Sequence, residues 1–308
     1  MFVVESRRED HQEKAQELLG LLEGEGDKVR GGKPSIRVGI SGAPGVGKST
    51  FIEGFGTWVA EQGVKIAVLA IDPSSARTGG SILGDRTRMQ LLAQHENAFI
   101  RTTPSSGTLG GVARHTSEAI AVCDAAGYDL ILVETVGVGQ SEYAVADVVD
   151  MFLLLVSPGA GDELQGIKRG VMELADEIVV TKADGPLEST AAIVRSEYRS
   201  ALRLLQRKVP EWAPPVRSVS SIEKTGLDVV FDDIRAYFDA QEESGRLGEN
   251  RASQRQAALW AVVEDELMRA VRRDAKLVER IEREVRGGGL SVLHGAKRML
   301  DSVVKGGV

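Results

Sequence analysis

The sequence predicts an α/β fold in which helices flank a mostly parallel central sheet. Short apolar runs alternate with helical segments along most of the chain. A glycine-rich loop joins the first apolar run to the helix after it. Polar or acidic residues follow several runs directly, at the position where ligands bind in open parallel sheets. Such alternation is typical of strand–helix–strand units, which place all strands in parallel.

Three regions are expected along the chain. Residues 1–34 form an N-terminal helical extension, residues 35–243 the α/β domain, and residues 244–308 a C-terminal helical arm. Strands are predicted at 36–40, 64–71, 98–101, 128–133, 150–156, 178–180 and 214–219. Helices are predicted at 5–23, 51–61, 112–126, 188–208 and 226–241. Helical spacing also covers 252–285, with an interruption at 272–274, and 290–304 after a run of glycines.

The composition narrows the class of protein. The chain has 308 residues, with 38 basic and 45 acidic side chains and a net charge of −7. This acidic balance argues against nucleic acid as a partner, because phosphate binding normally needs a basic excess. No apolar run approaches a membrane span, and the first residues lack a signal-peptide core. The single cysteine, Cys123, lies in an apolar helical run and is predicted to be a core residue. We therefore expect a cytoplasmic protein with no nucleic-acid or membrane partner.

A phosphate-binding loop follows the first strand. It matches the pattern G-x-x-x-x-G-K-[ST] between a strand and a helix, which is the context that makes the pattern specific. Glycines let backbone N–H groups point at phosphates, and the helix N-terminus adds positive potential. Lys48 supplies a catalytic charge, and the Ser49 hydroxyl is a ligand for Mg²⁺. The predicted nucleotide-binding residues here are Gly42, Ala43, Pro44, Gly45, Val46, Gly47, Lys48, Ser49 and Thr50.

Acidic residues at two strand ends extend this site. Asp72 ends the second strand, and the loop after it contains Asp85. Glu134 ends the fourth strand at the position of the aspartate in the Asp-x-x-Gly motif of most P-loop GTPases, so it is expected to serve the metal and catalysis. We expect Asp72, Asp85 and Glu134 near the metal. Gln140 is the nearest candidate to orient the attacking water.

A second motif selects the base. The segment Thr181-Lys182-Ala183-Asp184 matches [NT]-K-x-D and follows a buried strand. A carboxylate accepts hydrogen bonds from guanine N1–H and the 2-amino group, whereas adenine offers neither donor there, so Asp184 favours GTP. The Lys182 stem is expected to pack along the base. Backbone N–H groups of Ser220, Ser221 and Ile222 are expected to contact the guanine oxygen.

These motifs together resemble the MeaB/ArgK family, whose members accompany adenosylcobalamin-dependent methylmalonyl-CoA mutase. The segments 72–75, 84–89, 134–141 and 165–168 carry the resemblance beyond a generic P-loop protein. It covers nearly the whole chain and implies a P-loop NTPase of the SIMIBI type. The chief departure from the family pattern is Ser221-Ile222.

The resemblance also implies a function. It implies GTP hydrolysis to GDP with Mg²⁺, a homodimer formed through the C-terminal helices, and a chaperone that gates cofactor loading and protects or reactivates the mutase. Residue by residue, Ser49 and Glu134 would hold Mg²⁺, with Asp72 and Asp85 in or near the metal shell. A further switch segment facing the mutase would contain Asp162, Gln165 and Lys168.

Several alternatives remain open from the residues alone. The chain could be a GTPase metallochaperone for another metalloenzyme, although one cysteine and four scattered histidines offer few soft metal ligands. A protein-targeting GTPase would need a methionine-rich RNA-binding domain. A P-loop small-molecule kinase would lack the Lys182–Asp184 motif, and a non-catalytic module would use the nucleotide as a structural plug. The mutase served could act on another acyl-CoA, and the C-terminal helices could fold back instead of pairing.

Overall fold

The structure is a computed structural model that describes residues 9–22, 28–29, 31–72, 89–104, 109–135, 141–158, 169–205 and 208–305. The chain divides into two compact units, Met1–Gln254 and Arg255–Val308. The sequence analysis placed the start of the C-terminal arm at residue 244, and this domain boundary stays a prediction.

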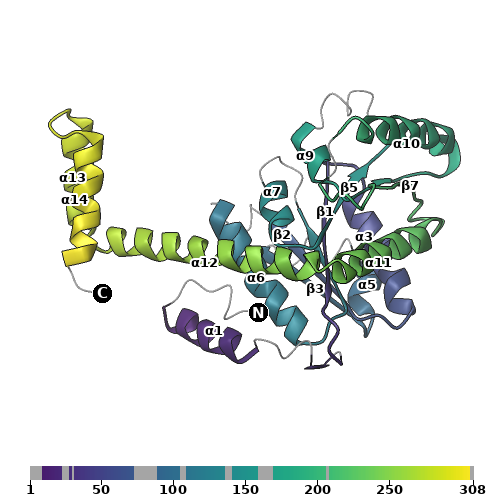
Figure 1. Ribbon diagram of the computed structural model, residues 1–308, viewed down its shortest axis with the longest axis horizontal. Helices are drawn as coiled ribbons and strands as arrows, with labels where there is room; N and C mark the ends of the chain where they lie inside the picture. Colours follow the sequence, from purple (N-terminus) through teal and green to yellow (C-terminus); the bar gives the residue numbers. More distant parts are fainter. Residues whose placement is uncertain are drawn as a thin grey trace. The chain divides into compact units, whose positions relative to one another are not determined.

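A seven-stranded parallel sheet forms the centre of the first unit (Figure 1). The strand order is β3-β2-β4-β1-β5-β6-β7, and every pairing is parallel. The phosphate-loop strand β1 therefore lies between β4 and β5, in the middle of the sheet. The strands are β1 Ile36–Gly42, β2 Ile66–Asp72, β3 Ala98–Pro104, β4 Leu130–Glu134, β5 Met151–Val156, β6 Glu177–Val180 and β7 Val216–Ser218.

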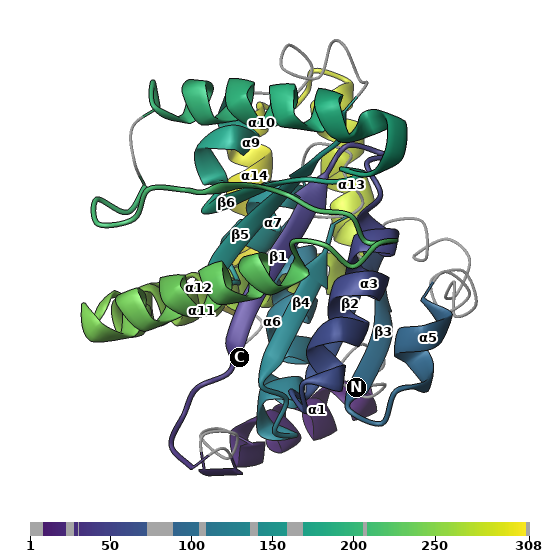
Figure 2. The same cartoon turned by 90° about the vertical axis from the view of Figure 1, so that its right-hand side faces the viewer.

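Helices cover both faces of this sheet (Figure 2). Alternate strand residues divide between two apolar clusters, as expected for a period of two. One cluster joins the sheet to α3 (Lys48–Glu61), α5 (Gln90–Gln94) and α11 (Leu227–Glu243). The other joins it to α6 (Leu109–Ala125), α7 (Ser141–Ala146), α9 (Arg169–Leu174) and α10 (Glu188–Leu202). Helix α1 (Glu9–Leu22) contacts α6, and a 3₁₀ turn η1 (Gly185–Leu187) precedes α10.

The predicted fold class is confirmed. Every predicted strand is present, with ends within three residues of those expected. Cys123 is buried in the second cluster, and burial raises the pKa of its thiol to about 12. The short helices α5 and α7 were not predicted, because five or six residues give too few turns for a readable period.

An arginine anchors the start of the next helix, α12 (Arg246–Arg273), to the sheet unit. Arg251 donates from Nε and Nη2 to the two carboxylate oxygens of Asp150, at 2.9 and 2.6 Å. It also donates to the carbonyl of Ser35 at 2.6 Å. Gln254 adds a 2.7 Å bond to the carbonyl of Val149. Asp150 is 5% exposed, so this two-pronged pair is shielded from water and holds residues 246–254 within the first unit.

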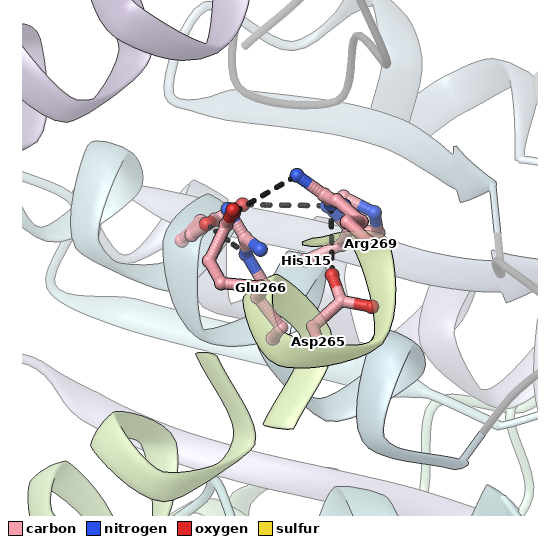
Figure 3. Close-up of polar contacts among 6 residues, drawn as sticks. His115, Asp265, Glu266 and Arg269 are labelled. Atoms are coloured by element: carbon pink, nitrogen blue, oxygen red, sulfur yellow. Dashed lines mark hydrogen bonds and ion pairs between the residues drawn. The ribbon is translucent and has the colours of Figure 1, made fainter. Parts of the chain in front are cut away.

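The second unit contains the rest of α12, α13 (Ala275–Arg286) and α14 (Val292–Lys305). On α12, Arg269 pairs with Asp265 at 2.8 Å and with Glu266 at 3.0 Å (Figure 3). The helical pattern over 252–285 is two helices, because Asp274 ends α12 and its side chain caps α13 by accepting from the N–H of Leu277. No helix in the described ranges is long and apolar enough to cross a bilayer.

A buried carboxyl in the sheet predicts a pH-dependent stability. Glu177, the first residue of β6, is 0% exposed, and no described residue donates a hydrogen bond to its carboxyl oxygens. Burial raises its pKa well above the usual value, Asp233 raises it further, and Arg217 opposes the shift. The folded pKa exceeds the unfolded one, so the stability is complete below the unfolded pKa and is lost as pH rises through the folded pKa.

We therefore expect Glu177→Gln to stabilise the protein at pH 8 by at least ~1 kcal/mol relative to its effect at pH 4.5. The amide keeps the shape of the protonated acid and cannot ionise. Urea unfolding of both proteins from pH 4.5 to 8 measures the difference. Glu243→Gln, at an exposed position of α11, is the control. A difference that stays constant with pH would contradict the assignment.

Candidate active site

Glycine conformation shapes the phosphate loop. Gly45 and Gly47 adopt φ values of 84° and 100°, in the left-handed region that favours glycine, and α3 begins directly after Gly47. Gly42 lies against β5, where a Cβ atom would sit 2.5 Å from the carbonyl oxygen of Leu155. The predicted loop therefore connects β1 to the N-terminus of α3 at the carboxyl edge of the sheet, as an anion site requires.

The lysine of the loop is held inside it. Lys48 is 9% exposed, and its Nζ donates to the carbonyls of Gly42 at 2.7 Å and Ala43 at 3.2 Å. Burial lowers its pKa, and the negative charges of Glu134 and Glu142 oppose that shift. The ammonium is thus a positioned cation beside the loop amides, suited to contact a phosphate.

A hydroxyl and a carboxylate meet beside this lysine. Glu134, 8% exposed, ends β4 next to Ile40 of β1 and Ala70 of β2 in the strand register. Ser49 Oγ lies 3.4 Å from Glu134 Oε1. A hydroxyl and a carboxylate are the hard oxygen donors that Mg²⁺ takes, with waters and phosphates filling the other positions. The pair predicted from sequence therefore fits a magnesium ion.

The structure describes only some of the other residues that were predicted to bind the metal or to orient the attacking water. Asp72 is the last residue of β2 and pairs with Pro104 in register, while its side chain lies outside the described atoms. Asp85 and Gln140 lie outside the described residues, as do Asp162, Gln165 and Lys168. Their assigned roles stay predictions.

The base motif is bonded directly to the phosphate loop. Thr181 Oγ1 donates to the carbonyls of Val46 at 2.7 Å and Val156 at 3.1 Å. Lys182 has a positive φ of 55°, which is rare outside glycine, and its Nζ donates to the carbonyl of Gly45 at 2.7 Å. These bonds fix the separation between the site for the phosphates and the site for the base.

A serine orients the carboxylate of Asp184, which is predicted to select the base. Ser220 Oγ donates to Asp184 Oδ2 at 2.5 Å and accepts from the N–H of Glu223 at 3.0 Å. The N–H of Ser220 donates to the carbonyl of Thr225 at 3.1 Å. Its backbone donor is therefore occupied, and the expected contact with the guanine oxygen is left to Ser221 and Ile222. Ser221 lies against Gly54 of α3, where a Cβ would be 3.0 Å from its carbonyl oxygen, and Ile222 is 79% exposed.

Sequence reasoning missed three residues that organise this site. The hydroxyl of Thr181 links the two motifs, and its place at the head of [NT]-K-x-D is the signal that could have identified it. Thr135 donates to Ser41 at 2.9 Å and joins the ends of β4 and β1. Glu142, 3% exposed on α7, acts on Lys48 from a short helix that gave no readable pattern.

Comparisons with known proteins agree with this geometry. The family described as "Methylmalonyl Co-A mutase-associated GTPase MeaB" matches residues 1–276. The mouse protein "Methylmalonic aciduria type A homolog, mitochondrial" is 48% identical over 296 residues, covering 94% of this chain and 71% of the relative. "GTPase ArgK" of Escherichia coli is 47% identical over 268 residues, covering 87% and 79%.

A solved structure supports the same assignment. The "Crystal structure of LAO/AO transport system kinase" superposes with a TM-score of 0.72 at 36% identity, covering 98% of this chain and 90% of that one. The family match spans most of the chain and includes both nucleotide motifs. With its central phosphate loop joined by hydrogen bonds to the Thr181–Asp184 segment, this chain belongs to the MeaB family of P-loop GTPases.

Proposed function

We propose that this GTPase serves an adenosylcobalamin-dependent acyl-CoA mutase, with methylmalonyl-CoA mutase as the first candidate. It would use GTP hydrolysis to gate cofactor loading and to protect or reactivate the mutase. The family description and the name of the mouse relative support the choice of partner. The observation that carries the proposal is the bonding of the base motif to the phosphate loop through Thr181 and Lys182. We further propose that the protein is specific for GTP and acts in the cytoplasm.

The residues divide the hydrolysis reaction among them. Lys48 and the loop amides would neutralise charge that develops on the β- and γ-phosphates in the transition state. Ser49 and Glu134 would hold Mg²⁺, assisted by Asp72 and Asp85. The ion, when bound, would supply positive charge that offsets the negative charge developing on the phosphate groups. Gln140 is proposed to orient the attacking water, and Asp184 selects guanine.

Helices α7 and α9 are proposed to connect the nucleotide site to the surface that a partner contacts. Glu142 of α7 acts electrostatically on Lys48. The next residue, Tyr143, packs so closely on Gly170 of α9 that any side chain at Gly170 would overlap the tyrosine hydroxyl. Closely packed groups transmit displacement to one another, so a change at Lys48 that moves α7 also moves α9. We propose that a mutase distinguishes GTP from GDP through these helices and the segments that precede them.

Binding to the mutase should therefore depend on the nucleotide. We expect purified methylmalonyl-CoA mutase to bind this protein with affinities that differ at least ~10-fold between GDP and a non-hydrolysable GTP analogue, which corresponds to about 1.4 kcal/mol of differential affinity. Calorimetry measures both affinities, and phosphate release measures whether the mutase accelerates hydrolysis. Equal affinities together with unchanged hydrolysis would refute the mutase role and leave the GTPase assignment intact.

The C-terminal arm is proposed to form a homodimer. On α12, Leu259, Trp260, Val263 and Leu267 are between 42% and 61% exposed and recur at helical spacing. A stripe of this kind is typical of a surface that a second chain covers.

We expect Trp260→Glu combined with Leu267→Glu to convert the dimer to a monomer, because burying two carboxylates costs several kcal/mol. Light scattering after size-exclusion chromatography measures the mass. Arg272→Glu is the control, since it adds negative charge at an exposed α12 position about 180° around the helix from Val263. A double variant that remains dimeric would exclude this stripe as the interface.

A further inference from the structure

A row of arginines lies on the first unit, on the helix that follows the base motif. Arg195, Arg199 and Arg203 recur every four residues along α10 and just past its end. Together with Arg217 of β7 they line a cavity of about 570 Å³. Leu202, Leu205 and Pro214-Pro215 complete its walls. The cavity is therefore lined by positive charge, although the net charge of the chain is −7.

The row of arginines adds little to the stability of α10. Like charges spaced by four residues on a helix repel one another. Arg199 and Arg203 lie near the C-terminus of α10, where the helix dipole favours cations, but Arg195 lies two turns earlier. Of the acids on α10, Glu188 is nearly two turns before Arg195, and Glu197 projects from the opposite side of the helix. The row is therefore better explained by a ligand than by stability.

The four arginines differ in whether a carboxylate of the protein already pairs with the guanidinium group. Arg217 donates to both carboxylate oxygens of Asp233, at 2.5 and 2.9 Å, so its charge is compensated within the fold. Among the residues that the structure describes, no carboxylate forms an ion pair with Arg195, Arg199 or Arg203. All three are exposed, and their guanidinium groups are the ones available to an anion.

We propose that this row, the α10 arginine groove, docks an extended acidic segment of a partner protein. Four helical residues rise about 6 Å along the axis, and two residues of an extended chain rise about 6.6 Å. Acids at alternate positions of an extended segment thus match successive arginines. Each guanidinium binds a carboxylate through two parallel hydrogen bonds. Among the described strands, β7 is the last one on this side of the sheet, and Pro214-Pro215 forms a stiff wall.

Other anions fit the groove less well. The arginine row spans about 12 Å along the helix, so one small anion would not reach all three guanidinium groups. A nucleic acid would meet the same charges, but the net charge of −7 repels a long polyanion. An acidic segment of a few residues engages the row without approaching the acidic remainder of the surface.

Binding of a labelled peptide to the full chain tests the proposal. The probe is a fluorescein-labelled peptide of alternating glutamate and alanine, measured by fluorescence anisotropy. We expect R195Q/R199Q/R203Q to weaken binding at least ~10-fold, and R195K/R199K/R203K to weaken it less, because lysine keeps the charge and loses the two-pronged geometry. Binding to the unaltered protein should also weaken as salt is raised.

A matched control separates the groove from general electrostatics. R272Q/R280Q/R283Q removes the same charge from exposed positions of α12 and α13 and should leave peptide binding unchanged. The groove variant should keep the melting temperature and the partner-free GTP hydrolysis of the unaltered protein, which shows that the fold survives. Equal loss in the two triple variants overturns the proposal. Tighter binding of a single-stranded oligonucleotide than of the peptide, abolished by R195Q/R199Q/R203Q, also overturns it. Neither outcome bears on the mutase role.

Discussion

Lys48→Ala is expected to lower GTP turnover by at least roughly 10²–10³-fold, the loss typical for removing one positioned charge from a transition state. The side chain is almost completely buried, and its ammonium already lies beside the loop carbonyls of Gly42 and Ala43. The loop amides remain, so GTP binding should weaken less than turnover.

Single-turnover phosphate release at saturating GTP measures this effect separately from binding. Lys65→Ala is the matched control, because Lys65 is an exposed lysine of the same domain, immediately before the second strand. It should leave turnover unchanged. Unchanged hydrolysis in Lys48→Ala would refute the assignment of the phosphate loop as the catalytic centre.

Asp184→Asn is expected to weaken GTP binding by roughly 10- to 100-fold, the range for losing hydrogen bonds to a charged group, and to favour xanthosine triphosphate. The structure adds a reason for the switch. Ser220 Oγ uses its acceptor site for the N–H of Glu223 and directs its proton at Asp184 Oδ2. In the variant the amide oxygen would take the serine proton, so the NH₂ group would face the base. The carbonyl at C2 of xanthine accepts from that group, whereas the amino group of guanine does not.

Calorimetry with GTP, xanthosine triphosphate and ATP measures the change in specificity. Asp228→Asn, on the exposed side of α11, is the control. We also expect Ser220→Ala to reduce the preference for xanthosine triphosphate when combined with Asp184→Asn, because the amide is then free to rotate. If Asp184→Asn left GTP affinity intact, a different residue would read the base.

Much of the fold was predictable because its signals are local. Buried parallel strands are continuous apolar runs, as in Met151–Val156 and Leu130–Glu134. Residue types at fixed spacing identify the loop Gly42–Thr50 as a phosphate-binding pattern and the segment Thr181–Asp184 as a guanine-binding pattern. The spacing also indicated the interruption at 272–274, where Asp274 caps α13, but it did not reveal short helices such as α7.

The sequence by itself determined the P-loop GTPase class and predicted a metal-binding acid and a guanine reader, because each signal depends on residues that are neighbours along the chain. Only the tertiary structure decided how they act together. Thr181 bonds to Val46 across 135 residues, Ser220 orients Asp184 across 36, and Glu142 acts on Lys48 from a different helix. Such contacts depend on which strands are adjacent in the sheet, and strand order is set by the packing of the whole core.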